Sequence, residues 1–164
     1  MTKDKILRLL IVGGVIILID QITKLYIHTS YAMGSVKTVI PGFFNIVHYH
    51  NPGGAFGLFA GQSQIVRVLV FLVISIIATG FILWLYRSIP KTHPMLANAL
   101  ALIFGGAVGN LIDRIRMGEV DDFLDVYIMN YHWPAFNIAD SAICIGVGIF
   151  IFHMIFKKIP EELM

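Results

Sequence analysis

The sequence is short of charge. Only 13% of its 164 residues are Asp, Glu, Lys or Arg, whereas 57% are hydrophobic and the mean hydropathy is +0.80. Roughly a quarter of the residues in a soluble domain are charged, so these values exclude an ordinary soluble fold and indicate a membrane protein. A net charge of +2 is too small to indicate a nucleic-acid partner. The length suits one domain over residues 1–164.

Cysteine is equally scarce. Cys144 is the single cysteine of the chain, which excludes an intramolecular disulfide and gives no information on the redox compartment. It lies within an apolar run, and we expect it to be buried. Metal ligands are also few, because His48 and His50 alternate along a presumed strand without a third His or Cys nearby in the sequence. We therefore expect no metal and no cofactor.

Long apolar runs, by contrast, are abundant. A bilayer-spanning helix takes about 20 residues, and four runs reach that range, at approximately residues 6–28, 65–86, 95–112 and 138–156. The first follows a basic N-terminus, as in a secretory signal. Asp20 and Lys24 interrupt it and no small-residue cleavage site follows, so we expect it to be retained. Gly105 and Gly109 in the third run are spaced for close contact with another helix.

The segment between the first two runs, residues 29–64, does not look helical. Short β-branched and aromatic stretches at 35–40 and 43–49 are bounded by Pro-Gly and Asn-Pro-Gly-Gly turns. Such stretches between turn residues are typical of strands. The predicted fold is an α-helical integral membrane protein, with four transmembrane helices and a small β-sheet in the first outer loop.

Basic residues assign an orientation to the four spans. They flank the N-terminus, the link between the second and third spans, and the C-terminus: Lys3, Lys5, Arg8, Arg87, Lys91, Lys157 and Lys158. Loops rich in Lys and Arg face the cytoplasm. Both termini are therefore predicted to be cytoplasmic, and the first and third links to lie outside.

The polar residues near the membrane gather at one depth. Five aspartates follow the third span or open the fourth, namely Asp113, Asp121, Asp122, Asp125 and Asp140. Asp20 lies 14 residues after Ile6, about 21 Å up a hydrocarbon core about 30 Å thick. Asn110, Arg114 and Asn137 fall at the same outer level. Ionisable groups at membrane depth are costly and usually functional, so we predict a polar site near the outer face.

Simpler interpretations stay open for the residues of the first and third spans. Asp20 and Lys24 are spaced i,i+4 and can neutralise each other on a helix. Asn110, Asp113 and Arg114 share a helical face and can form a salt-bridged helix end at the interface.

The fourth span and the segment before it have simpler interpretations too. Asn137 is placed to cap a helix whose first turn contains Asp140. Asp121 and Asp125 are expected to be solvated loop charges.

Clustered aspartates also allow a reaction. Two carboxyl groups close together cannot both ionise easily, so one keeps its proton near neutral pH. The ionised one can then take a proton from water while the other donates a proton, which is general acid–base hydrolysis of a peptide bond. Asp140 is an obvious member of such a pair. The residues alone leave its partner open among Asp113, Asp121, Asp122 and Asp125.

Five short motifs follow one another along nearly the whole chain: DQITK at 20–24, NPGGAF at 51–56, GNLIDR at 109–114, VDDF at 120–123 and FNIAD at 136–140. Each is weak alone, but the ordered set resembles the motifs of bacterial lipoprotein signal peptidase (signal peptidase II). The resemblance implies a membrane-embedded aspartic peptidase of the bacterial cytoplasmic (inner) membrane. Such an enzyme removes signal peptides from prolipoproteins just before a cysteine that bears diacylglycerol.

The resemblance also implies roles for individual residues. Asp122 and Asp140 correspond to the catalytic pair. Substrate-binding or supporting positions are Asp20, Lys24, Asn51, Gly54, Asn110, Asp113, Arg114 and Asn137. The implied partners are diacylglyceryl-modified prolipoproteins and membrane lipid, with no nucleic acid, metal or cofactor.

Two of the five motifs depart from the family pattern. Asp121 stands before Asp122 where the family usually has Val, so either aspartate competes for the catalytic position. Neighbours in an extended segment point in opposite directions, and Phe123 after Asp122 favours Asp122. In the outer loop, Pro52 and Gly54 stand in a motif that usually reads Asn-x-Gly-Ala-Ala-Phe, and Pro52 is expected to stiffen it.

Two other functions remain as alternatives. A small transporter or proton or cation relay would also use intramembrane carboxylates, but these lie in one layer and do not cross the bilayer. A non-catalytic scaffold with a salt-bridged rim would not require Asn51, Asn110 and Asn137 as well.

Overall fold

The computed structural model describes residues 1–53 and 63–156, so Gly54 lies outside the described residues. Its helices are α1 (Lys3–Ser30), α2 (Gln64–Ser88), α3 (Pro94–Met117) and α4 (Ile138–Phe156), and its strands are β1 (Val36–Ile40), β2 (Phe44–Asn51), β3 (Val120–Ile128) and β4 (Tyr131–His132). Within the described residues, four helices are long and apolar enough to cross a membrane. This confirms the four predicted spans.

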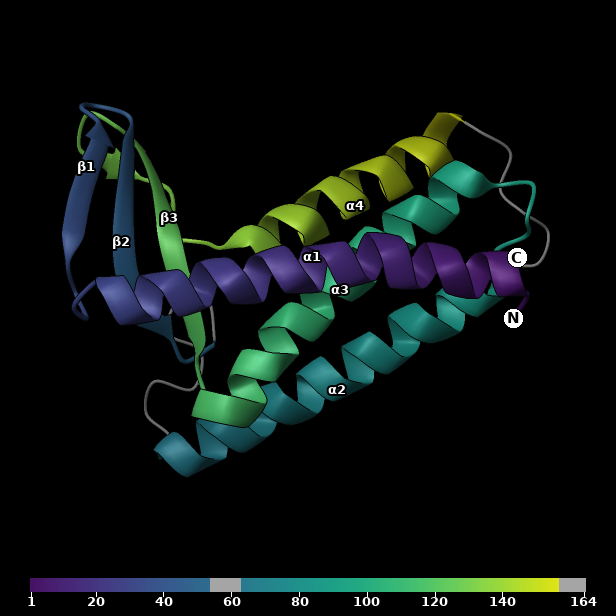
Figure 1. The fold of residues 1–164 in the computed structure, drawn as a ribbon, viewed down its shortest axis with the longest axis horizontal. Helices are drawn as coiled ribbons and strands as arrows, with labels where there is room; N and C mark the ends of the chain where they lie inside the picture. The colour runs from purple at the N-terminus through teal and green to yellow at the C-terminus, as the bar shows by residue number, and fades with distance from the viewer. Residues whose placement is uncertain (54–62, 157–164) are drawn as a thin grey trace.

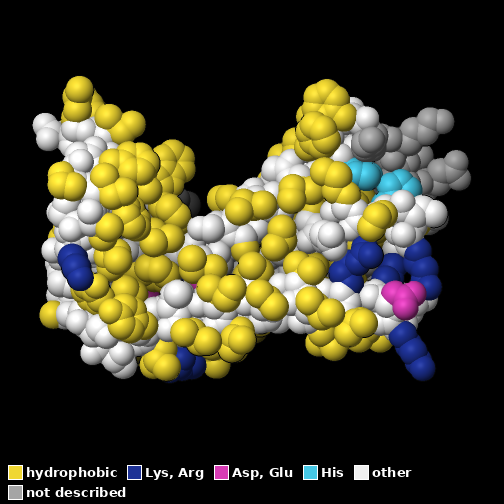
Figure 2. All heavy atoms as spheres, turned by 45° about the horizontal axis from the view of Figure 1, so that its top comes forward, with side chains coloured by type: hydrophobic (Ala, Val, Ile, Leu, Met, Phe, Trp, Pro, Cys, Tyr) yellow, Lys and Arg dark blue, Asp and Glu magenta, His cyan; other side chains and the backbone are white. Residues whose placement is uncertain are grey.

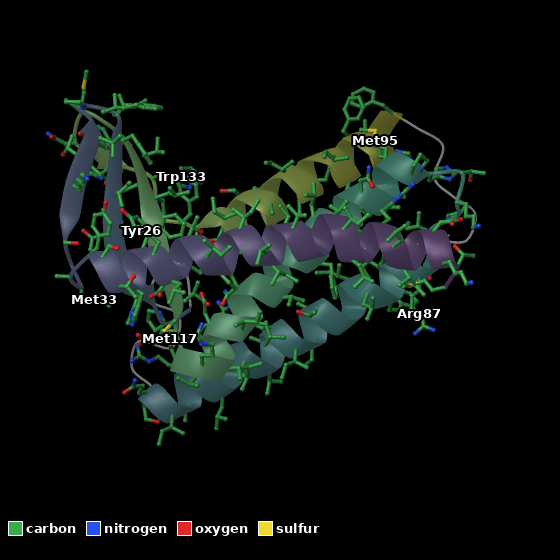
Figure 3. All side chains as sticks on the ribbon, viewed as in Figure 1. Tyr26, Met33, Arg87, Met95, Met117 and Trp133 are labelled. Carbon is green, nitrogen blue, oxygen red and sulfur yellow. The ribbon has the colours of Figure 1, made fainter. Side chains whose placement is uncertain are left out.

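Helix α3 occupies the centre of the helical bundle and packs against α1, α2 and α4. The sheet stands at one end of the bundle, next to the end of α1 (Figure 1). The first residues of α1 and the last described residues of α4 lie at the opposite end. Figure 3 shows the same two ends of the molecule, with Met33 beside the sheet and Arg87 at the far end.

The helices expose apolar side chains to their surroundings. In α2, Ile65 is 72% exposed and Ile77 65% exposed, and the buried residue of this helix is Tyr86 near its end. Figure 2 shows hydrophobic side chains spread over much of the visible surface. A helix that is hydrophobic on all sides, without a protein partner on most of them, is suited to lipid.

Glycines, which have no side chain, allow the helices to approach closely. A Cβ on Gly105 would lie 2.8 Å from the carbonyl oxygen of Gly13 in α1, and one on Gly109 would lie 2.7 Å from Asp20 Oδ2. A Cβ on Gly106 would collide with the carbonyl oxygen of Ala139 in α4. The predicted close contact at Gly105 and Gly109 is therefore confirmed.

The sheet is larger than the sequence predicted. Its strands are ordered β1-β2-β3-β4 and neighbouring strands are antiparallel. The first outer loop supplies β1 and β2 as predicted, but β3 and β4 come from the link between α3 and α4. Strand β2 pairs with β3 so that Tyr49 faces Asp122 and His50 faces Asp121. This pairing brings polar residues of the two outer segments together.

The apolar core and the polar site occupy different ends of the bundle. A buried hydrophobic cluster forms where α1 begins, α2 ends and α3 begins, and contains Leu9, Tyr86, Ile89, Leu96, Ala97, Leu100 and Ala101. The buried polar residues described below lie toward the sheet. The core thus anchors the helices at one end and leaves the other for polar contacts.

Replacing Gly106 by Ala should destabilise the protein, because the new Cβ would meet the backbone of Ala139 and Ile143 Cγ1 at 2.7 Å. Overpacking typically costs about 1–3 kcal/mol, and the better helix propensity of Ala offsets up to about 1 kcal/mol. Thermal unfolding in detergent should show a lower midpoint. Gly148→Ala is the control, since its Cβ has no atom within 4 Å. Equal midpoints for the two variants would contradict this packing.

Candidate functional site

Most of the polar residues predicted from the sequence come together where α1, α3, α4 and β3 meet. Six of them are buried: Asp20, Lys24, Asn110, Asp113, Asp122 and Asn137. Asp140 and Asn51 lie at the edge of this group, where Asp140 is half-buried and Asn51 is exposed. Polar groups removed from water need hydrogen-bond partners, and the contacts below supply them.

Asp122 is held by two amides. In β3 it is 3% exposed. Its Oδ2 accepts a hydrogen bond of 2.9 Å from Nδ2 of Asn51 at the end of β2, and its Oδ1 accepts one of 2.8 Å from Nδ2 of Asn137. Neither partner is charged, so the contacts fix the carboxyl group without supplying a positive charge.

Asp140 lies in the first turn of α4, where it forms a capping box with Asn137. The backbone N–H of Asp140 donates to Asn137 Oδ1 at 2.9 Å, and the backbone N–H of Asn137 donates to Asp140 Oδ2 at 3.2 Å. Such reciprocal bonds satisfy two unpaired donors at a helix start, which confirms the capping role of Asn137. The other oxygen of Asp140 accepts from Asn110 Nδ2 at 2.7 Å.

Asn137 and Asn110 link the two carboxyl groups. Asn137 Nδ2 donates to Asp122 and lies 3.3 Å from Asn110 Oδ1, while Asn110 donates to Asp140. Asp122 and Asp140 therefore share one framework of amides from β2, α3 and the start of α4. A pair of carboxyl groups positioned in this way can hold a water molecule and a substrate carbonyl between a base and an acid.

Burial raises the pKa of Asp122 to about 7, and the negative charge of nearby Asp140 is the second cause. The hydrogen bonds from Asn51 and Asn137 act in the opposite direction because they favour the ionised form. A carboxyl group with this pKa carries a proton part of the time at neutral pH. Asp122 is thus suited to donate or accept a proton.

Lys24 is the buried cation of the site. Its Nζ lies 2.8 Å from Asp20 Oδ2 and 2.7 Å from Asp113 Oδ2, and it donates to Asn110 Oδ1 at 3.0 Å. The predicted i,i+4 neutralisation of Asp20 by Lys24 is therefore real, and Asp113 shares the same cation. The second oxygen of Asp20 accepts from the backbone N–H of Ala139 at 2.9 Å, which ties α1 to the start of α4.

Gln21 is a site residue that the sequence reasoning missed. Its Nε2 donates to Asp113 Oδ1 at 2.9 Å and also lies 3.2 Å from Asp20 Oδ2. Its place between Asp20 and Lys24 in the motif at 20–24 is the signal that could have identified it. Arg114 joins the site at the end of α3, where its Nη1 donates to the backbone oxygen of Asn110 at 3.4 Å.

The structure corrects three expectations. Asp121 and Asp125 are not solvated loop charges, since they are 2% and 6% exposed in β3. The side chain of Asp125 accepts from Asn45 in β2 at 2.8 Å and contacts His132 Nδ1 at 2.8 Å. Pairing with β2 buries both aspartates. Cys144 is exposed, not part of the core.

A cavity opens beside Asp140. It has a volume of about 620 Å³ and is lined by Asn51 of β2 and by residues of the β4–α4 region, among them Trp133, Asp140 and Cys144. Figure 2 shows the surface hollowed between the sheet and the helices, and Figure 3 shows Trp133 between β3 and the start of α4. The mostly apolar walls suit an extended peptide or an acyl chain.

Known proteins match this chain closely. The sequence profile of the family described as signal peptidase (SPase) II matches residues 12–156. The lipoprotein signal peptidase of Desulforapulum autotrophicum is 52% identical over 161 residues, covering 98% of this chain and 99% of that protein. The lipoprotein signal peptidase of Syntrophus aciditrophicus is 47% identical and covers 95% of this chain and 97% of its own. A solved bacterial membrane enzyme superposes with a TM-score of 0.80 at 33% identity, covering 92% of this chain and 94% of the other.

Replacing Lys24 by Met should destabilise the protein strongly, because Asp20 and Asp113 would both lose their buried cation. Removing one partner of a buried ion pair costs roughly 3–5 kcal/mol. Lys91→Met is the matched control, since Lys91 forms an exposed pair with Asp4 and exposed pairs contribute about 0–1 kcal/mol. Thermal unfolding in detergent compares the two variants, and a Lys24 variant as stable as the Lys91 variant would contradict this account.

Proposed function

Since this chain belongs to the signal peptidase II family, we propose that it is an intramembrane aspartic endopeptidase that processes prolipoproteins. In this proposal residues 1–164 form one peptidase domain that removes the signal peptide just before the diacylglyceryl-modified cysteine. Asp122 and Asp140 form the catalytic pair. The observation that carries the proposal is the common amide framework of Asn51, Asn110 and Asn137, which holds both carboxyl groups, with Asp140 in the wall of an apolar cavity.

The proposed reaction begins with the shared proton on Asp122, whose pKa is raised to about 7. Asp140 takes a proton from water, the water oxygen bonds to the scissile carbonyl carbon, and Asp122 gives its proton to the carbonyl oxygen. The carbon–nitrogen bond then breaks as Asp140 gives its proton to the leaving nitrogen, while Asp122 takes a proton back from one hydroxyl of the diol. The products are a carboxylic acid and an amine, and the proton is again on Asp122. Each proton has a named donor and acceptor, as general acid–base hydrolysis requires.

The register of the pair is supported by the two neighbouring aspartates of β3. The Asp122 side chain contacts Asn51 and Asn137, whereas that of Asp121 contacts His48 and His50. Successive residues of a strand point to opposite faces, so the two carboxyl groups have separate surroundings. This arrangement favours Asp122 as the partner of Asp140.

Supporting residues keep the pair in place. Asp20 and Asn137 satisfy backbone donors in the first turn of α4, so the helix that carries Asp140 starts at a defined position. Lys24 and Asp113 connect α1 to α3 beneath it. Arg114 and Gly54 are proposed to contact substrate, as the family resemblance implies.

The proposed location is the bacterial cytoplasmic membrane, with both termini in the cytoplasm. Basic residues near the ends support this orientation, and Figure 3 places Arg87 at the end of the bundle away from the sheet. The catalytic pair then lies near the outer face, where a lipid-anchored cysteine and its preceding residues can reach it. Diacylglyceryl-modified prolipoproteins and membrane lipid are the proposed partners.

Asp122→Asn and Asp140→Asn should each lower cleavage of a diacylglyceryl-modified prolipoprotein by roughly 10²–10⁴-fold, because each removes a proton donor or acceptor. The assay uses protein purified into lipid and reads the cleavage site by mass spectrometry. Asp125→Asn is the control, as another buried aspartate of β3 with contacts to Asn45 and His132. Thermal melts verify that all variants are folded.

A folded wild type that fails to cleave, or an Asp122 variant as active as the Asp125 variant, would overturn the proposed pair. In the first case flux across the same liposomes would test the transporter alternative.

Cleavage should fall as pH rises above about 7, because Asp122 then loses the proton that it donates. Asn51→Ala removes a hydrogen bond that favours the ionised form of Asp122. The pKa of Asp122 should therefore rise, and the decline in kcat/KM should move to higher pH. Profiles of kcat/KM against pH for wild type, Asn51→Ala and Asp125→Asn test this. A decline that stays in place or moves to lower pH in the Asn51 variant would contradict the role of Asp122 as acid.

A further inference from the structure

A second cluster of polar side chains lies on the other side of β3 from the proposed catalytic pair. It consists of His28 near the end of α1, His48 and His50 on β2, and Asp121 on β3. One ligand atom from each residue lies within 4.8 Å of all the others. We call these four residues the histidine cluster.

Strand pairing explains how the cluster forms. His48 and His50 are two residues apart, so they share a face of β2, and His50 is directly opposite Asp121 in β3. The end of α1 brings His28 against the same face. Its ring centroid lies 5.5 Å from that of His48 and 6.3 Å from that of His50. The sequence alone offered only the two histidines of β2.

The distances between ligand atoms suit a tetrahedral metal ion. Asp121 Oδ1 lies 2.9 Å from His50 Nε2 and 3.7 Å from His48 Nε2, and Asp121 Oδ2 lies 3.5 Å from His28 Nδ1. Four ligands about 2.0–2.1 Å from a tetrahedral Zn²⁺ are about 3.3 Å from one another. The side chains therefore surround a space of the right size without needing large movements.

Neighbouring groups point the ring nitrogens into the cluster. His48 Nδ1 lies 2.9 Å from the backbone oxygen of Tyr31, which can only accept a hydrogen bond, so Nδ1 carries the proton. In the neutral ring the lone pair is then on Nε2, the atom that faces Asp121. His50 Nδ1 lies 3.2 Å from a carboxylate oxygen of Glu119. This contact likewise places a proton on Nδ1 and leaves the lone pair of the neutral ring on Nε2. Carbonyl or carboxylate partners of this kind are typical of metal-binding histidines.

The atoms that face one another are buried and lack hydrogen bonds. His48 Nε2, His50 Nε2 and Asp121 Oδ1 have no hydrogen-bond partner, and the side chains of His48 and Asp121 are 3% and 2% exposed. The 2.9 Å contact between His50 and Asp121 is therefore not aligned as a hydrogen bond. Buried polar atoms without partners are costly, and a cation bound to all of them would remove this cost.

We propose that the histidine cluster is a binding site for a divalent metal ion, with Zn²⁺ as its preferred occupant. Imidazole ligands suit Zn²⁺, Cu²⁺ and Ni²⁺, whereas Mg²⁺ and Ca²⁺ prefer oxygen. With three His and one Asp the site has four protein ligands, the number typical of structural zinc. His28 and His50 are 49% and 29% exposed and leave a path to solvent, while His48 and Asp121 form the buried base.

The metal would connect three separate parts of the fold. It binds α1 through His28, β2 through His48 and His50, and β3 through Asp121, the residue next to Asp122. The site is structural in this proposal, because it fixes the sheet against α1 and thereby the strand that carries Asp122. Its ligands take no part in the proposed reaction, since the side chains of Asp122 and Asp140 are hydrogen-bonded to Asn51, Asn110 and Asn137 instead.

Zinc binding to the purified full-length protein tests the proposal. The protein is freed of metal with a chelator, exchanged into chelator-free buffer in detergent, and titrated with Zn²⁺ in competition with a chromophoric chelator. We expect one Zn²⁺ per chain, a higher thermal midpoint in its presence, and visible absorption typical of four-coordinate Co²⁺ when Co²⁺ replaces Zn²⁺. Mg²⁺ should reproduce none of these effects.

Variants locate the site. Loss of an outer partner of a metal ligand typically weakens binding by roughly 10–100-fold, so we expect Glu119→Gln to have that effect and His28→Gln or His50→Gln to exceed it. His28 lies at the exposed end of α1, so its variant should remain folded even if the His50 variant does not. His132→Gln is the matched control, because His132 also contacts a buried aspartate, Asp125, but lies outside the cluster.

The proposal is overturned if folded wild type binds no Zn²⁺, or if His28→Gln binds it as tightly as His132→Gln. Because the readouts are metal content, absorption and melting temperature, they do not depend on whether the protein cleaves prolipoproteins.

Discussion

The start of helix α4 is the constraint on which the rest of the site depends. The first backbone N–H groups of a helix have no partners within it, and away from water each unpaired group is costly. Asp20 of α1 accepts from the N–H of Ala139, and Asn137 accepts from that of Asp140. The amide of Asn137 also donates to Asp122 in β3. Capping this one helix therefore fixes α1 and β3 around it, and the same contacts hold both carboxyl groups of the proposed pair.

Much of the fold follows from the sequence because a bilayer limits the choices. Backbone N–H and C=O groups in hydrocarbon must form hydrogen bonds within their own segment, so long apolar runs become helices. The number and order of these helices can therefore be predicted from the sequence. The same geometry gives each polar residue a depth, which is why Asp20, Asn110 and Asn137 could be assigned to one layer from helical rise alone. Depth gives no lateral position, however. Lys24 can pair with Asp113 as well as with Asp20 because Gly109 has no side chain. The Asp20 carboxylate occupies the space that a Cβ at this position would fill.

Strand β3 and the partners of its aspartates could not be predicted from the sequence. Its segment Val120-Asp-Asp-Phe-Leu-Asp-Val-Tyr127 does not alternate between polar and apolar residues, because polar groups are needed on both faces. Asp121 and Asp125 resembled loop charges for the same reason. Their partners, His50 and Asn45, lie about 70 to 80 residues earlier in the chain and become neighbours only through the pairing of β2 with β3. Such long-range pairing is not contained in any local pattern.

The distribution of positive charge separates the proposed catalytic carboxyl groups from the supporting ones. Asp20 and Asp113 both pair with the buried ammonium group of Lys24. Within the described residues, no Lys or Arg forms an ion pair with Asp122 or Asp140, which are held by amides and backbone N–H groups. Amides fix the position of a carboxyl group but neutralise no charge, so burial and mutual repulsion keep the pKa of Asp122 raised. A lysine in place of these amides would hold the pair more firmly but would favour the loss of the proton that general acid–base hydrolysis needs.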